Sequence, residues 1–218
     1  LAALYGDKSF ISIATGAKQS IANVMMVLLD PGDEVVLPSP YWVSYREIIK
    51  LAEGTMVVVP SSVENNFKIT PEELEQAITP RTKIFCFSSP CNPTGTVYSK
   101  DELSALAAVL EKHHGVYVLS DEIYEHISFL GKHESIAQFE SLKDRVIIVN
   151  GVSKAYAMTG WRLGYIGAPL WIAKACEKMQ GQITSGTCAI TQRAALSAIT
   201  SDQTSTEKMR EEFQKRRD

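Results

Sequence analysis

The sequence has 218 residues, of which 45% are hydrophobic and 22% are charged, with a formal net charge of −3. This composition is typical of a folded globular protein and excludes a largely disordered chain. The small negative charge disfavours a general nucleic-acid or membrane-surface binder, and the longest apolar run, Val24–Leu29, is far shorter than the roughly 20 residues of a membrane-spanning helix.

Short β-branched runs alternate with segments of helical periodicity along the chain. The predicted strands are Ile11–Thr15, Glu34–Leu37, Thr55–Val59, Lys83–Phe87, Val116–Leu119, Val146–Val149 and Leu163–Gly167. The segments with apolar residues at helical spacing are Gln19–Leu29, Trp42–Leu51, Leu103–Lys112, Leu170–Met179 and Thr191–Ile199. This alternation predicts an α/β fold with three layers, α/β/α, around a central, mainly parallel sheet of seven strands.

Two further helix starts are marked by capping boxes. Thr70-Pro71-Glu72-Glu73 and Ser99-Lys100-Asp101-Glu102 each place a glutamate three residues after a hydroxyl N-cap. No repeat or linker divides the chain, so we expect residues 1–218 to form one domain. The apolar stretch at Leu1 resembles the tail of a helix, and Glu207–Asp218 is a charged helical run without a cap. We therefore expect a chain that is cut at both ends.

The four cysteines have neither C-x-x-C spacing nor the density of a disulfide framework. Reduced thiols are the expectation, and they predict a cytoplasmic protein. We expect no zinc or other metal site.

Four polar segments follow predicted strands, at the sheet edge where ligands of parallel α/β proteins bind. They are residues 15–18, 88–95, 120–124 and 151–154. At the first, Gly16 joins a strand directly to a helix and leaves free N–H groups that suit an anion, although many such turns contain glycine for geometry alone. At the second, Pro90 and Pro93 stiffen the loop around Asn92, whose amide either orients a ligand or bonds its own turn.

Asp121 and Lys154 are the charged candidates at the other two segments. A carboxylate at the end of an apolar run is partly buried and needs a cationic or donor partner, unless Asp121 only caps the following turn. If the chain turns helically after Asp121, the Tyr124 side chain would face the same side as the Asp121 carboxylate. Lys154 beside an apolar strand end either has its pKa lowered by desolvation, as a nucleophilic amine requires, or reaches solvent as a surface lysine.

Three motifs, in this order, resemble those of the class I, fold-type I aminotransferases that depend on pyridoxal phosphate, and especially their aspartate aminotransferase branch. The motifs are Asn92-Pro93-Thr94-Gly95, Ser120-Asp121-Glu122-Ile123-Tyr124 and Ser153-Lys154-Ala155-Tyr156-Ala157-Met158-Thr159-Gly160-Trp161-Arg162-Leu163-Gly164. The resemblance covers about Gly16 to Ile199 and implies the large, cofactor-binding domain of this family. The family's N-terminal segment and C-terminal small domain have no counterpart in this sequence. By the same resemblance, residues 201–218 are expected to begin the helix that leads to that small domain.

The resemblance also implies roles for individual residues around pyridoxal 5'-phosphate. Lys154 would carry the cofactor as a Schiff base and move the proton at the substrate α-carbon. Asp121 would pair with the ring nitrogen, while Tyr124 and Asn92 would hydrogen-bond the phenolic oxygen. Trp42 would stack on the ring, unless it is a core tryptophan. The phosphate would be held by Gly16, Ala17, Lys18, Ser153 and Arg162.

The function implied by the resemblance is transfer of an amino group between an L-amino acid, preferably aspartate, and a 2-oxo acid such as 2-oxoglutarate, by a homodimer. Within the same fold, the alternatives are an aromatic or prephenate aminotransferase and a C–S lyase. Residues 41–45, Tyr-Trp-Val-Ser-Tyr, and the Lys154 motif favour the aspartate branch. A non-catalytic sensor fused to a DNA-binding module is a further alternative, whereas a nicotinamide-binding domain is excluded because no G-x-G-x-x-G follows a strand.

Overall fold

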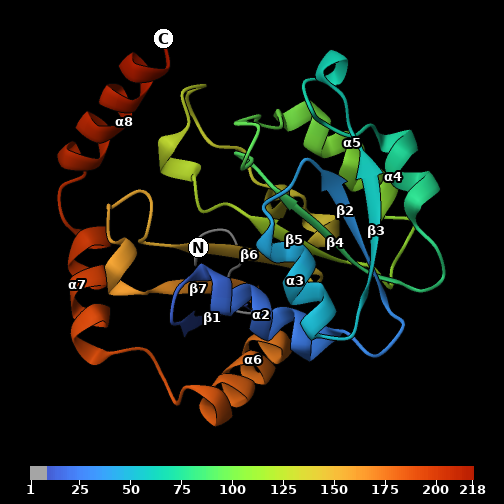
Figure 1. The fold of residues 1–218 in the computed structure, drawn as a ribbon, viewed down its shortest axis with the longest axis horizontal. Helices are drawn as coiled ribbons and strands as arrows, with labels where there is room; N and C mark the ends of the chain where they lie inside the picture. Colours follow the sequence, from blue (N-terminus) through green and yellow to red (C-terminus); the bar gives the residue numbers. More distant parts are fainter. Residues whose placement is uncertain (1–8) are drawn as a thin grey trace.

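The computed structural model describes residues 9–218, so the helix tail predicted at Leu1 lies outside the described residues. A seven-stranded sheet with the order β1-β7-β6-β5-β4-β2-β3 forms its centre (Figure 1). The strands are β1 (Ser9–Ala14), β2 (Glu34–Ser39), β3 (Thr55–Pro60), β4 (Thr82–Ser88), β5 (Tyr117–Asp121), β6 (Val146–Gly151) and β7 (Gly164–Pro169). All seven predicted strands are confirmed, with each end within two residues of its predicted position.

The sheet is mainly parallel, as predicted. β2 runs parallel to β3 and β4, β4 to β5, and β5 to β6. β7 runs antiparallel to both β6 and β1. The register pairs Ser88 of β4 with Asp121 of β5, and Asp121 with Val149 of β6. The carboxyl ends of these three central strands therefore meet at one edge of the sheet.

Helices cover both faces of the sheet and complete the predicted three layers (Figure 1). On one face, α4 (Pro71–Ala77) and α5 (Lys100–Leu110) bury apolar side chains such as Leu74 and Leu106 against the strands. On the other face, α2 (Ala17–Leu28), α3 (Ser44–Leu51) and α6 (Leu170–Ile183) contribute Ile21, Ile49 and Ile172. The strands are buried from both sides because parallel sheets need such double cover.

Both predicted capping boxes are present. Thr70 Oγ1 accepts the Glu73 N–H, and the Glu73 carboxylate accepts the Thr70 N–H. Ser99 and Glu102 make the same reciprocal pair. These caps satisfy N–H groups that the first helical turn leaves free. α5 accordingly begins at Lys100, three residues before its predicted apolar start at Leu103, because the cap sets the boundary.

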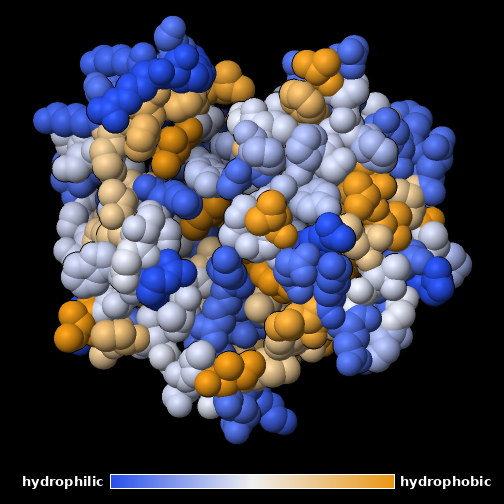
Figure 2. Space-filling model, viewed as in Figure 1, coloured by the Kyte–Doolittle hydropathy of each residue, from blue (hydrophilic) through white to orange (hydrophobic). Residues whose placement is uncertain are grey.

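After α6, the chain ends in two further helices. α7 (Ala189–Thr200) and α8 (Thr204–Arg217) lie at its side, and α8 is predominantly hydrophilic (Figures 1 and 2). α7 exposes Ile190, Leu196 and Ile199. None of the helices within residues 9–218 combines the length and the apolar character needed to cross a membrane.

Candidate active site

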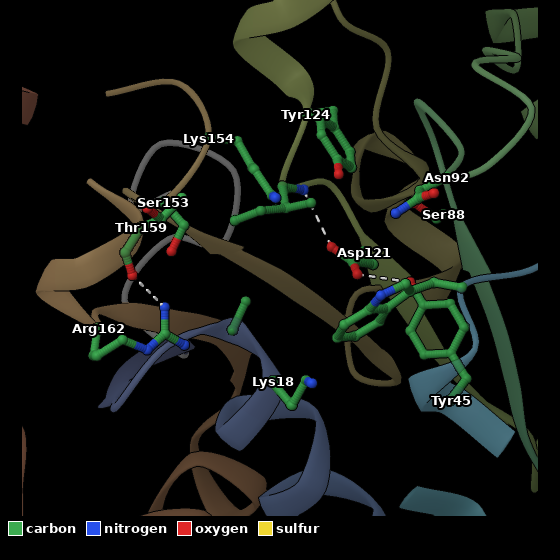
Figure 3. Close-up of a pocket in the computed structure, with 13 residues that line it drawn as sticks. Lys18, Tyr45, Ser88, Asn92, Asp121, Tyr124, Ser153, Lys154, Thr159 and Arg162 are labelled. Carbon is green, nitrogen blue, oxygen red and sulfur yellow. Dashed lines mark hydrogen bonds between the residues drawn. The ribbon is translucent and has the colours of Figure 1, made fainter. Parts of the chain in front are cut away.

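A cavity of about 240 Å³ lies where the carboxyl ends of β4, β5 and β6 meet (Figure 3). Of the ten residues predicted for the site, the cavity lining includes nine: Ala17, Lys18, Trp42, Asn92, Asp121, Tyr124, Ser153, Lys154 and Arg162. Gly16, the tenth, lies directly against Arg162. The lining also contains four residues for which the sequence predicts no role: Tyr45, Ser88, Ile123 and Thr159.

Asp121 is the buried charge of the site, with 4% of its surface exposed. Oδ2 accepts a hydrogen bond of 2.6 Å from the Tyr45 hydroxyl, and Oδ1 accepts the Ile123 N–H at 3.2 Å. Burial raises the pKa of Asp121 from 3.8 to about 6, although these two hydrogen bonds favour the ionised form. The donor that a buried Asp121 requires is therefore supplied by the protein itself.

Glu122 points away from the cavity, as its position next to Asp121 in a strand end requires. Its carboxylate accepts hydrogen bonds from the Ser120 and Ser135 hydroxyls and contacts His133 Nε2 at 2.8 Å. Burial alone would lower the pKa of His133, but the bond to Glu122 outweighs it and raises that pKa above 6.5. Glu122 thus belongs to a separate buried network behind the site.

Lys154 projects from the segment after β6 into the cavity (Figure 3). Its Nζ lies 5.7 Å from the centre of the Tyr124 ring. The residue as a whole is exposed. Lys154 thus lines a cavity that also holds the buried carboxyl group of Asp121.

The start of α2 and the guanidinium of Arg162 form a cup for an anion. Gly16 precedes α2 with φ of 91°, and a Cβ at this position would overlap Arg162 Nη2. The first N–H groups of a helix have no intrahelical partner, so Ala17 and Lys18 present donors beside the guanidinium. Arg162 itself has φ of 53° and donates from Nη1 to the Thr159 carbonyl at 2.7 Å. This donor set fits a phosphate group.

Trp42 lies in the loop before α3, which begins at Ser44 and not at Trp42 as predicted. Lys18 Nζ is 5.0 Å from the centre of the indole ring, and the Tyr45 ring meets it edge-on at 5.4 Å. Trp42 is partly buried, lines the cavity and also packs against the core cluster on the α2 and α3 face of the sheet, so its stacking role stays a prediction. Asn92 also lines the cavity, beside Ser88 (Figure 3).

The comparison with known protein families decides the assignment. The family model described as aminotransferase class I and II matches residues 1–218. The chain belongs to this aminotransferase family. The spacing of the three motifs and the geometry of the cavity agree with that membership.

Relatives of known sequence and structure extend the family assignment. The chain is 49% identical over 210 residues to the aspartate/prephenate aminotransferase of Cereibacter sphaeroides, covering 95% of this chain and 52% of the relative. It is 48% identical to the aspartate aminotransferase of Geobacillus stearothermophilus, covering 94% and 53%. The crystal structure of the aspartate aminotransferase of Rhizobium meliloti matches with a TM-score of 0.93 at 46% identity, covering 95% and 52%. The chain thus spans about half the length of the curated relatives it matches.

Proposed function

We propose that this protein is an aminotransferase that uses pyridoxal 5'-phosphate, with Lys154 as the residue that carries the cofactor. The observation that carries the proposal is the composition of one cavity. A buried carboxylate at Asp121, an amine at Lys154 and the guanidinium of Arg162 line the same space. Carboxylate, amine and phosphate cup are the three groups that this cofactor requires of a protein.

When bound, the cofactor supplies a protonated ring that accepts the electrons left after the substrate loses its α-proton. Lys154 would hold the cofactor through its side-chain nitrogen and would move the proton at the substrate α-carbon. Asp121 would keep the ring nitrogen protonated through its carboxylate. Tyr124 and Asn92 would hydrogen-bond the phenolic oxygen, and Trp42 would pack on the ring.

The phosphate is assigned to the cup at the start of α2. The N–H groups of Ala17 and Lys18 and the turn at Gly16 face the guanidinium of Arg162. Ser153 adds a hydroxyl to the same lining. A planar guanidinium and helix N–H groups bind phosphate oxygens through charge-assisted hydrogen bonds.

Reductive trapping tests this assignment. The protein is incubated with pyridoxal phosphate, reduced with borohydride and digested, and we expect the added mass on the peptide that contains Lys154. Lys154→Ala should lose the label, while Lys143→Ala, at a partly exposed lysine outside the cavity, should keep it. An unlabelled wild-type protein, or a label that persists at the site in Lys154→Ala, would refute the assignment.

For the substrates we propose aspartate and 2-oxoglutarate. The names of the relatives, aspartate aminotransferase and aspartate/prephenate aminotransferase, support aspartate and keep prephenate as the second candidate. The half-reaction is followed with aspartate, phenylalanine and alanine through the absorbance of the lysine-bound cofactor. Aspartate should change it fastest, and no change with any amino acid would favour the non-catalytic sensor.

We propose a homodimer as the assembly. The exposed apolar residues of α7 support it, because apolar side chains grouped on one helix are commonly covered in oligomers. The cytoplasmic location stays a prediction from the cysteine spacing.

A further inference from the structure

Tyr45 is a buried phenol in the wall of the cavity, and its hydroxyl has one short hydrogen bond. Oη donates to Asp121 Oδ2 at 2.6 Å, and Tyr45 is 2% exposed (Figure 3). The two residues are 76 positions apart in the chain, on α3 and β5. A buried aromatic side chain on a helix is usually explained by packing in the hydrophobic core. Packing alone does not explain why the Tyr45 hydroxyl donates a short hydrogen bond to a carboxylate.

Several neighbouring groups affect the ionisation of Asp121, and the Tyr45 hydroxyl is one of them. Burial and the neighbouring Glu122 carboxylate favour the protonated acid, whereas Tyr45, the Ile123 N–H and the Lys154 ammonium favour the carboxylate. Cys86, the remaining titratable neighbour, is a buried thiol whose pKa is raised by burial, so it is neutral. Burial likewise raises the pKa of Tyr45 well above 10, so its hydroxyl keeps its proton and stays a donor.

We propose that Tyr45 is a positioning residue for Asp121: its hydroxyl holds the carboxylate ionised and in place, so that the ring nitrogen of bound pyridoxal phosphate keeps its proton. A proton shared between a carboxylate and a pyridine nitrogen stays on the more basic atom. A hydrogen bond donated to the carboxylate makes that carboxylate the weaker base. The part of the inference that concerns the ring nitrogen rests on the proposed function, whereas the effect of Tyr45 on Asp121 does not.

The position of Tyr45 is fixed from two further directions. Its backbone N–H donates to the Trp42 carbonyl at 3.0 Å, and its ring meets the Trp42 indole edge-on. Tyr45 therefore connects the tryptophan proposed to stack on the ring with the carboxylate proposed to pair with the ring nitrogen. A side chain held by a helix and by an aromatic contact presents its hydroxyl at a constant place.

The first test measures the titration midpoint of the Asp121 carboxyl group in the cofactor-free protein. The ¹³C carboxyl signal of Asp121, assigned with Asp121→Asn, is titrated between pH 4 and 9 in the cofactor-free protein. Tyr45→Phe should raise the midpoint by about one pH unit, the expected effect of a lost hydrogen bond to a charged group. Tyr98→Phe is the matched control, because Tyr98 is a buried phenol bonded to the Ile69 N–H and outside the cavity. An unchanged midpoint in Tyr45→Phe would overturn the proposal.

The second test follows the ring nitrogen with ¹⁵N-labelled pyridoxal phosphate bound to the protein. The ¹⁵N signal should move toward the unprotonated position in Tyr45→Phe and remain in place in Tyr98→Phe. A signal that stays protonated in Tyr45→Phe would overturn the second half of the proposal. If the cofactor does not bind to the wild-type protein, the proposed function fails, and the titration of Asp121 still decides the role of Tyr45.

Should Tyr45→Phe fail to fold, the wild-type protein decides the question. The ¹³Cζ signal of Tyr45 reports on its hydrogen bond. It should titrate with the same midpoint as the Asp121 carboxyl, because protonation of Asp121 changes the acceptor. A Tyr45 signal that is insensitive to the ionisation of Asp121 would overturn the proposal.

Discussion

The Arg162 guanidinium occupies the space that a side chain on Gly16 would need. A Cβ on Gly16 would overlap Nη2 and lie 2.9 Å from Cζ. Glycine at this turn therefore has two functions: it permits φ of 91°, and it allows the guanidinium to approach the start of α2. The proposed phosphate cup depends on the second function.

Gly16→Ala should weaken the binding of pyridoxal phosphate by about ten- to a hundredfold, because Arg162 must move away from the helix start. Gly32→Ala is the matched control, since Gly32 has φ of 93° and no atom within 4 Å of the place that a Cβ would take. Both variants should lose about 1 kcal/mol of stability from backbone strain. Fluorescence titration with the cofactor distinguishes them, and equal affinities would contradict the cup.

Asp121→Asn should stabilise the cofactor-free protein at pH 8 and leave its stability unchanged near pH 3. The folded-state pKa of about 6 lies above the ordinary 3.8, so stability falls as the pH rises between these values. A shift of about two units corresponds to an upper limit of about 3 kcal/mol. Urea unfolding at both pH values measures the gain, with exposed Asp144→Asn as the control. A loss of stability at pH 8 would count against the buried-charge argument.

Glu122→Gln should destabilise the fold by about 2 kcal/mol at pH 6 and by less at pH 9. The pKa of His133 is raised in the folded state, so the stability from its pairing with Glu122 is present below pH 6.5 and decreases as the pH rises through the raised pKa. Denaturant unfolding at pH 6 and 9 tests this, with exposed Glu177→Gln as the control. A penalty that grows with pH would show that His133 is neutral in the pair.

Replacement of Ile190 and Leu196 by aspartate should shift the protein from dimer to monomer. Both side chains are exposed on α7, and charges placed there oppose the burial of this surface. Sedimentation velocity over a range of concentrations measures the change. Leu51→Asp, at an exposed leucine on α3, is the comparison. A wild-type monomer at high concentration would contradict the homodimer.

The sequence by itself determined the features that depend on near neighbours in the chain. The capping boxes at Thr70 and Ser99 were readable because a cap and its partner are three residues apart. The seven strands were readable from short β-branched runs, and the polar residues after them could be located because parallel strands present their carboxyl ends at one edge. Asp121 and Lys154 were located as candidates in this way, whereas Arg162 and the roles of all three residues were predicted from the resemblance to the aminotransferases.

The tertiary structure decided which distant residues meet. Tyr45 was visible beside Trp42 in the sequence, yet only the placement of α3 against β5 made its hydroxyl the donor to Asp121. The antiparallel course of β1 and β7 and the contact of Arg162 with Gly16 also depend on the order of strands in the sheet. Local sequence patterns cannot predict these contacts. The two residues of each pair are far apart in the chain, and they meet only when the strands and helices have assembled into the complete sheet with its two helix layers.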